Sequence, residues 1–145
     1  MKNIAIALVI TALSCTQAQA ERAAVVEGET VTQSQWLAYM PELASQMNKD
    51  VPKTIDHVTT IERYISKEDG LELQYKVDTA AYPDTTKDEW LALVVQLKLG
   101  EVNKYCTDPA FQVWLELGTI MHHTYYFNDG TYMGKFIINP DIDCK

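Results

Sequence analysis

Two cysteines enclose roughly the last forty residues of the chain, and this pair constrains the fold more than any other feature. Cys106 and Cys144 are the only cysteines after residue 20. A disulfide between them closes a loop of about 38 residues, which restricts the unfolded chain and adds roughly 4 kcal/mol of stability. That is a large share of the stability of a small domain. Two free buried thiols are the alternative, while a zinc site lacks a second ligand at C-x-x-C spacing.

The segment between these cysteines is expected to form a short helix and then a β-hairpin. Asp108-Pro109 is a helix-start signal, because Asp caps free N–H groups and Pro fits the first helical position. Two β-rich runs then flank the hairpin dipeptide Asp129-Gly130. A two-residue turn gathers the large apolar side chains on one face. The pairs it makes are Phe127 with Tyr132, Tyr125 with Gly134, His123 with Phe136, and Met121 with Ile138.

The first twenty residues have the three parts of a cleavable secretion signal. Lys2 supplies positive charge, Ile4–Leu13 is an apolar run too short to span a bilayer, and Ala18-Gln19-Ala20 is a cleavage site. Cys15 lies where a bacterial lipoprotein carries its acylated cysteine, but the three residues before it form a poor lipobox. We expect export to the periplasm or the medium of a bacterium, with lipidation of Cys15 as the less favoured alternative.

The remaining chain is acidic and has the length of one domain. Without Lys2 it carries 11 basic and 20 acidic side chains, a net charge of about −9. Such a charge repels nucleic acid and anionic membrane surfaces, so no nucleic-acid partner is expected. No second apolar stretch is long enough for a membrane span. We predict a signal peptide over residues 1–20, a disordered lead-in over 21–30 and a single domain over 31–145.

Two capping boxes mark helix starts before Cys106. Thr32-x-x-Gln35 precedes an apolar stripe of helical spacing, in which Pro41 must bend the helix or divide it in two. Thr86-Lys-Asp-Glu89 precedes a more apolar run, whose hydrophobic side chains cover more than half of the helix circumference. We therefore expect the second helix to be the most buried one and to end near residue 104 or 105.

A hairpin is predicted between these helices, around Glu68-Asp69-Gly70. Residues 71, 73, 75 and 77 are apolar or aromatic and alternate with polar ones, which is typical of a half-buried strand. A three-residue loop sets this strand against Ile65 and Ile61, whereas a two-residue Asp69-Gly70 turn sets it against glutamates. We therefore predict the three-residue loop, with Gly70 in a left-handed bulge position.

The order helix, hairpin, two helices, hairpin predicts an α+β fold. Antiparallel hairpins with helices gathered on one side form a two-layer sandwich. We expect a four-stranded antiparallel sheet made of the two hairpins, with a short fifth strand as an option, packed with about three helices.

No motif for catalysis or for a cofactor stands out. His122 and His123 are adjacent on a strand and point to opposite faces, so they cannot chelate one metal ion together. A G-x-S-x-G nucleophile motif and a Gly-rich phosphate loop are absent. Asn128-Asp129-Gly130 is too short for a calcium loop and fits a turn. We predict a protein that is not an enzyme and has no cofactor or metal.

The outward face of the last hairpin is rather apolar for a solvated surface. Either the first helix covers this face, or it is an exposed patch that meets a partner or a second copy. The candidate interaction patch consists of Ile120, His122, Tyr126, Met133, Lys135 and Ile137, with Thr124 on the same face.

Several short motifs recur together in one group of proteins. They are Pro52-Lys53-Thr54-Ile55-Asp56, a strand with Leu73 and Tyr75, Cys106-x-Asp108-Pro109, Leu117-Gly118, and a final Asp143-Cys144. In these motifs the chain resembles small exported bacterial proteins and lipoproteins of unassigned function. The resemblance implies a Cys106–Cys144 disulfide and a periplasmic location, and it transfers no active site. At the level of fold the chain is also similar to pilotins of type II secretion, which pair a sheet with helices and are usually lipid-anchored.

Two functional hypotheses follow. The first is a disulfide-stapled periplasmic protein that acts through protein–protein contact, as an accessory or pilotin-like factor of an envelope or secretion system. The alternative is a periplasmic inhibitor or immunity protein against a toxin or hydrolase, because strong acidity suits a basic target. A deep pocket of converging polar groups would favour an enzyme instead.

Overall fold

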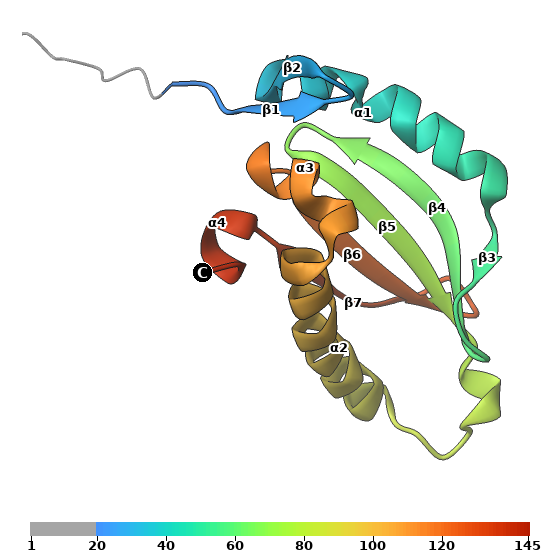
Figure 1. Cartoon of the computed structure of the whole chain (residues 1–145). Helices are drawn as coiled ribbons and strands as arrows, with labels where there is room; N and C mark the ends of the chain where they lie inside the picture. Colours follow the sequence, from blue (N-terminus) through green and yellow to red (C-terminus); the bar gives the residue numbers. More distant parts are fainter. Residues whose placement is uncertain (1–19) are drawn as a thin grey trace, which may run out of the picture.

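A five-stranded sheet with strand order β3-β4-β5-β6-β7 forms the centre of the protein in a computed structural model that describes residues 20–145 (Figure 1). The predicted signal peptide up to residue 19, and Cys15 with it, lies outside the described residues. Its strands are β3 (Lys53–Thr54), β4 (Thr59–Lys67), β5 (Gly70–Val77), β6 (Ile120–Phe127) and β7 (Tyr132–Ile138). The predicted optional fifth strand is therefore present as β3.

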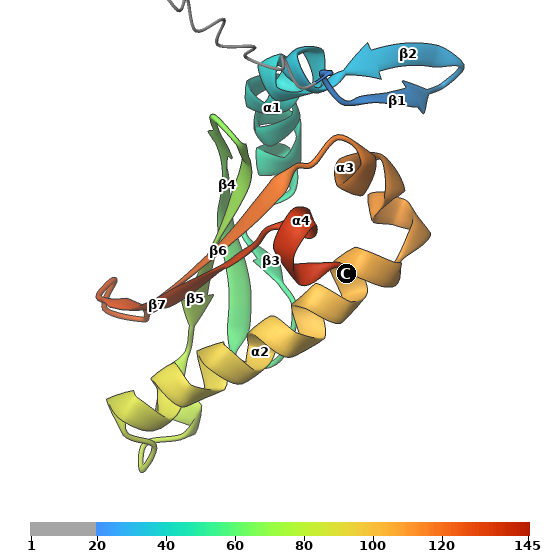
Figure 2. The same ribbon diagram turned by 90° about the vertical axis from the view of Figure 1, so that its left-hand side faces the viewer.

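The helices lie on one face of this sheet (Figure 2). They are α1 (Gln33–Met47), α2 (Lys87–Thr107), α3 (Gln112–Glu116) and α4 (Pro140–Asp143), with short 3₁₀ turns at Asn48–Asp50, Thr79–Ala81 and Pro109–Phe111. Both predicted capping boxes form, at the starts of α1 and α2. The first helix is continuous although it contains Pro41. Within residues 20–145, no helix combines the length and the apolar character needed to cross a bilayer.

The sheet is mixed, so the prediction of a wholly antiparallel sheet is wrong. β5 and β6 are parallel neighbours, and Gly70 lies beside Ile120 at their common start. Between them α2 carries the chain back along the full length of the sheet, and such a crossover joins parallel strands. Local patterns predicted the two hairpins, but they contain no information on how one hairpin adjoins the other.

The register of the last hairpin is confirmed over most of its length. Met121 pairs with Ile138, His123 with Phe136 and Tyr125 with Gly134. The fourth predicted pair is wrong, because a bulge after Tyr125 shifts the register. The turn has three residues, and the N–H of Phe127 donates to the carbonyl of Thr131. Gly130 occupies the left-handed position in this turn, with φ of 81°.

The predicted three-residue loop of the first hairpin is wrong, because the loop consists of Glu68 and Asp69 alone. Lys67 pairs with Gly70, so its loop has two residues. Gly70 does not have a positive φ; it is extended and starts β5. A β-carbon on Gly70 would overlap the main-chain carbonyl of Ile120 on the neighbouring strand. Glycine is needed here for close approach of two backbones and not for a turn.

The expected disordered lead-in is instead a small hairpin of β1 (Ala23–Val26) and β2 (Glu29–Thr32). Its turn residues Glu27 and Gly28 both have positive φ, which matches the twist of a two-residue hairpin turn. The guanidinium of Arg22 donates to the carboxylate of Asp141 at 2.5 Å, which ties this segment to α4. A disordered lead-in was predicted because this segment is short and directly follows the predicted signal peptide.

The disulfide between Cys106 and Cys144 is confirmed, with a Cα–Cα separation of 5.3 Å. It joins the last turn of α2 to the residue after α4. Hydrogen bonds also connect the helices to the start of β6, where the hydroxyl of Tyr105 donates to the carbonyl of Thr119 at 2.7 Å. The indole N–H of Trp36 donates to the Thr119 hydroxyl at 2.8 Å. These contacts hold α1, α2 and β6 together at one end of the sheet.

Candidate binding groove

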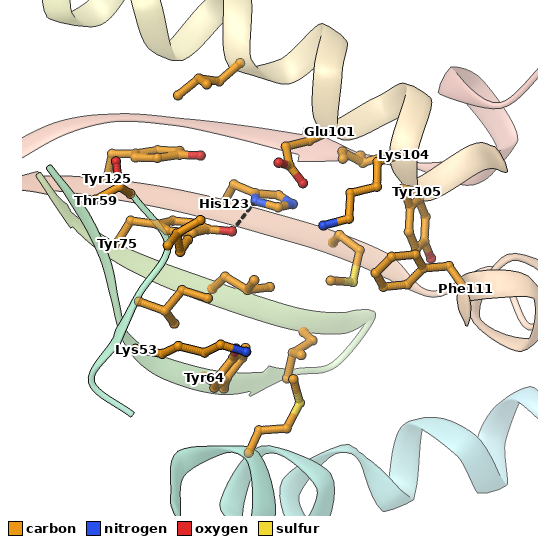
Figure 3. A pocket seen from close by; sticks show the side chains of 18 of the residues that line it. Lys53, Thr59, Tyr64, Tyr75, Glu101, Lys104, Tyr105, Phe111, His123 and Tyr125 are labelled. Atoms are coloured by element: carbon orange, nitrogen blue, oxygen red, sulfur yellow. Dashed lines mark hydrogen bonds between the residues drawn. The ribbon is translucent and has the colours of Figure 1, made fainter. Parts of the chain in front are cut away.

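A groove of about 490 Å³ opens between α2 and the face of the sheet (Figure 3). Its floor comes from alternate residues of β4, β5 and β6, one wall comes from α2, and the other comes from β3 and the residues after it. The end near the disulfide is closed by Phe111 and Trp114, and α1 contributes Met47. The floor residues include Ile61, Tyr64, Leu71, Tyr75, Met121 and Tyr125.

The groove exists because α2 packs along the β7 edge of the sheet. There Gly134 makes room for the helix, since a β-carbon on it would lie 2.9 Å from the side chain of Leu91. Only Trp90, Val94 and Tyr105 of α2 are buried, so this helix is less buried than its apolar sequence predicts. Its exposed large apolar residues are Leu91, Leu93, Val95, Leu97 and Leu99. An apolar helix of this kind is normally covered.

Stacked rings form the centre of the groove floor. Tyr75 of β5 stacks on two rings of the neighbouring strand β6, on Tyr125 with ring centroids 4.5 Å apart and on His123 at 5.7 Å. His123 in turn stacks on Phe136 at 4.6 Å. The Tyr75 hydroxyl and Nδ1 of His123 share a hydrogen bond of 2.9 Å. The floor is therefore rigid, and it is apolar except at the ends of these side chains.

Burial keeps these floor groups uncharged. It raises the pKa of the Tyr75 and Tyr125 hydroxyls above the ordinary value of 10. It also lowers the pKa of His123 to about 4, and the electrostatic effects of His122 and Lys104 act in the same direction. At neutral pH the groove thus presents neutral hydroxyls and a neutral imidazole to whatever occupies it.

We expect His123 to make the protein less stable in mild acid. Its folded pKa lies below its unfolded value, so its contribution is complete above pH 6.5 and is lost as the pH falls toward 4. Between pH 7 and pH 5 this loss is about 2 kcal/mol. Urea unfolding at the two pH values measures it. A His123→Phe variant should lack this dependence, and an equal loss in the variant would refute the assignment. Carboxylates with a lowered pKa, such as Glu72, also stabilise the fold, but their contribution is lost only below this pH range.

Charged side chains stand on both walls of the groove (Figure 3). Glu101 and Lys104 come from α2, whereas Lys53 and Asp56 come from the opposite wall. Among residues 20–145, none of these four side chains forms a salt bridge. They are available to pair with charges on an occupant.

The predicted interaction patch lies on the other face of the sheet, and α1 does not cover it. Lys135 and Ile137 are exposed there, while His122 is held by Asp69 at 2.8 Å. Ile120 and Tyr126 are half-buried. Met133 belongs to the hydrophobic core, and it lies at the bulge in the hairpin. The structure therefore does not place all six patch residues on one exposed surface.

The groove was missed at the sequence level, although two of its signals were present. The alternation of Leu71, Leu73 and Tyr75 indicated the floor strand. The excess of apolar residues on α2 was interpreted as burial, and it marks instead a helix with an open side. His123 was recognised only as a histidine that cannot share a metal with His122.

The titratable groups that line the groove are one histidine, two carboxylates, two lysines and several tyrosine hydroxyls. The groove lining contains neither serine nor cysteine. In the described part of the chain, no three His, Cys, Asp or Glu side chains gather closely enough to hold a metal ion. The indole N–H of Trp90 is the one buried side-chain polar group without a hydrogen-bond partner in the same residues.

The sequence matches no protein-family model and no curated protein. Its fold has known counterparts. The pilotin EpsS of the Vibrio vulnificus type 2 secretion system aligns with a TM-score of 0.61 at 16% identity, over 78% of this chain and 96% of that chain. The type II secretion system pilotin AspS of Vibrio cholerae aligns with a TM-score of 0.56 at 16% identity, over 75% and 94%. The chain shares the fold of these pilotins.

A Pseudomonas aeruginosa protein described as secreted shares this fold too, with a TM-score of 0.61 at 11% identity, over 78% of this chain and 93% of that chain. The predicted fold-level likeness to pilotins is thus confirmed. At these identities the likeness concerns the fold alone. Together with the disulfide, these neighbours are consistent with a location outside the cytoplasm.

Proposed function

We propose that this protein is a periplasmic, pilotin-like accessory factor of a secretion system, which receives a helical segment of a partner protein in its groove. The open apolar groove beside α2 is the observation that carries this proposal. It is the hollow that an amphipathic helix fills when it buries one apolar face against another protein. The fold of the two pilotins supports the choice of a secretion system over other envelope assemblies.

A helix fits this site better than an extended segment does. The groove floor is a sheet face, whose main-chain groups are already paired within the sheet. An extended segment lying on it would leave its own main-chain groups unpaired in apolar surroundings, whereas a helix pairs its own.

Strand addition at the adjacent sheet edge is also blocked. β3 pairs with Thr60 and Ile61 of β4. Further along, the side-chain amide of Asn48 donates to the carbonyl of Tyr64, and the N–H of Tyr64 donates to the Asn48 side chain, both at 2.8 Å. The outer edge of β4 thus offers little free main chain to a new strand.

A pair of variants on one helix tests the proposal. Leu97→Glu places a charge in the groove, and Val95→Glu places the same charge on α2 outside it. Both positions are exposed, at 39% and 65%, so both variants should fold with nearly unchanged stability. We expect Leu97→Glu to weaken partner binding by at least about tenfold, because a buried unpaired charge costs several kcal/mol.

The measurement is affinity capture from envelope extract with quantitative mass spectrometry, followed by titration of the captured segment. Wild type and Val95→Glu should retain one and the same secretion-system protein, and its segment should gain helical circular dichroism on binding. Equal capture by both variants would contradict docking in the groove. Stabilisation by a small molecule with no protein retained would contradict the whole class of function.

A further inference from the structure

A second hollow, of about 430 Å³, lies beside the groove toward the start of α2. Asp56 lines both hollows. Leu93 in the second hollow precedes Leu97 in the groove by one helical turn. A segment that lies along α2 in the groove therefore reaches this second hollow, which we call the aromatic pocket. It is bounded by His57, Tyr82, Trp90, Asp56 and Glu89.

Three rings surround the aromatic pocket at steep angles to one another. The centroids of Tyr82 and Trp90 are 6.1 Å apart with 63° between the ring planes. The centroids of His57 and Tyr82 are 6.0 Å apart at 66°. Nε2 of His57 and the Tyr82 hydroxyl share a hydrogen bond of 2.7 Å, which fixes both rings. Tilted rings of this kind offer faces and edges, and the faces attract cations.

Two carboxylates complete the pocket, and no lysine or arginine lines it. Oδ1 of Asp56 accepts from the N–H groups of Val58 and Thr59, at 2.9 and 2.8 Å. Oε2 of Glu89 accepts from the main chain and hydroxyl of Thr86, both at 2.8 Å. Among the described residues, Oε1 of Glu89 has no hydrogen bond. The pocket thus carries two carboxylates at fixed positions, with no lysine or arginine among its lining residues.

Trp90 is the buried side chain among those that line the pocket. The side chain of Trp90 is 5% exposed, and its indole N–H has no acceptor within residues 20–145. An unpaired buried N–H is costly. The Trp90 ring lines the pocket, so its indole N–H signal can report on what fills the pocket.

We infer that the aromatic pocket holds the side chain of a lysine or arginine, carried by the protein segment that lies in the groove. This rests on the proposed function for the source of the side chain. Aromatic faces with nearby carboxylates suit an alkylammonium or guanidinium group. A divalent metal ion would need more oxygen ligands than the two carboxylates provide, since both already bind main-chain N–H groups.

The isolated protein can report on the pocket through the indole N–H signal of Trp90 in a ¹H–¹⁵N spectrum, assigned with Trp90→Phe. The probes are Nα-acetyl-lysine methylamide, its arginine counterpart, and the uncharged norleucine analogue. We expect the two basic probes to shift the Trp90 signal with saturation and the norleucine probe to leave it in place. No shift with the basic probes, or an equal shift with norleucine, would overturn the inference.

Glu89→Gln is the matched variant, because a glutamine at this position preserves the capping box of α2 while it removes the charge. It should weaken binding of the basic probes and of the captured partner by about fivefold. Glu101→Gln removes a charge from the groove wall outside the pocket and should not change probe binding.

The two proposals fail in different ways. If Leu97→Glu abolishes partner binding while Glu89→Gln and the probes have no effect, the groove assignment stands and the pocket assignment falls. If the basic probes bind but Glu89→Gln leaves partner affinity unchanged, the pocket binds free cations, and its assignment to a docked side chain is overturned.

Discussion

Cys144→Ser will lower the free energy of unfolding by about 4 kcal/mol in oxidising buffer, because the disulfide closes a long loop. The bond spans 38 residues between the end of α2 and the end of the chain. The loop contains α3, β6 and β7. Without the disulfide, the end of α2 is no longer crosslinked to the segment that follows β7. Urea unfolding of the variant, of Cys106→Ser and of wild type under reducing conditions should give the same loss.

The reducing agent itself provides the control for this effect. It should destabilise wild type strongly and leave Cys144→Ser unchanged, since that variant has no bond to break. A wild-type unfolding midpoint that does not respond to the reductant would show that the crosslink contributes nothing to stability.

Gly70→Ala will destabilise the fold by about 3 kcal/mol or more, because the added methyl group meets backbone and not a flexible side chain. A β-carbon on Gly70 would overlap the carbonyl of Ile120, and the N–H of Ile120 already donates to Asp69 at 2.9 Å. The start of the parallel pair β5–β6 must therefore separate. Thermal or urea unfolding of the purified variant measures the effect, and failure to fold would be its extreme form.

Gly100→Ala is the matched control for this substitution. Gly100 lies inside α2, and a β-carbon there has no heavy atom within 4 Å. Because alanine favours the helix over glycine, this change should stabilise the protein by about 0.5–1 kcal/mol. Equal effects of the two substitutions would contradict the close approach of β5 and β6.

Local sequence signals predicted the features that depend on neighbouring residues. The capping boxes at Thr32 and Thr86 formed as expected, since a cap depends on residues within one turn. The Met121, His123 and Tyr125 pairs were correct because one register gathers the apolar side chains. The predicted turn lengths were wrong in both hairpins. The last hairpin contains a bulge, and in the first hairpin Gly70 pairs within the sheet beside a third strand, β6. The turn dipeptide encodes neither feature.

Features set by distant parts of the chain could not be predicted in this way. The parallel pair β5–β6 depends on the path of α2 across the sheet. The groove depends on where α2 rests, and Gly134 on β7 decides this by making room for Leu91. A sequence pattern shows that a helix is apolar on several sides, but not which side stays open. The interaction patch was therefore predicted on the sheet face opposite the groove.

Site-specific photo-crosslinking in the producing cell tests the groove most directly. A photoreactive residue replaces Leu97 in the groove wall and, in a second strain, replaces Ile137 on the opposite sheet face. We predict that position 97 gives one adduct, in which mass spectrometry locates the link in an amphipathic helical segment carrying a lysine or arginine. Position 137 should give no such adduct. Adducts from position 137 with none from position 97 would contradict the assignment of the groove as the binding site.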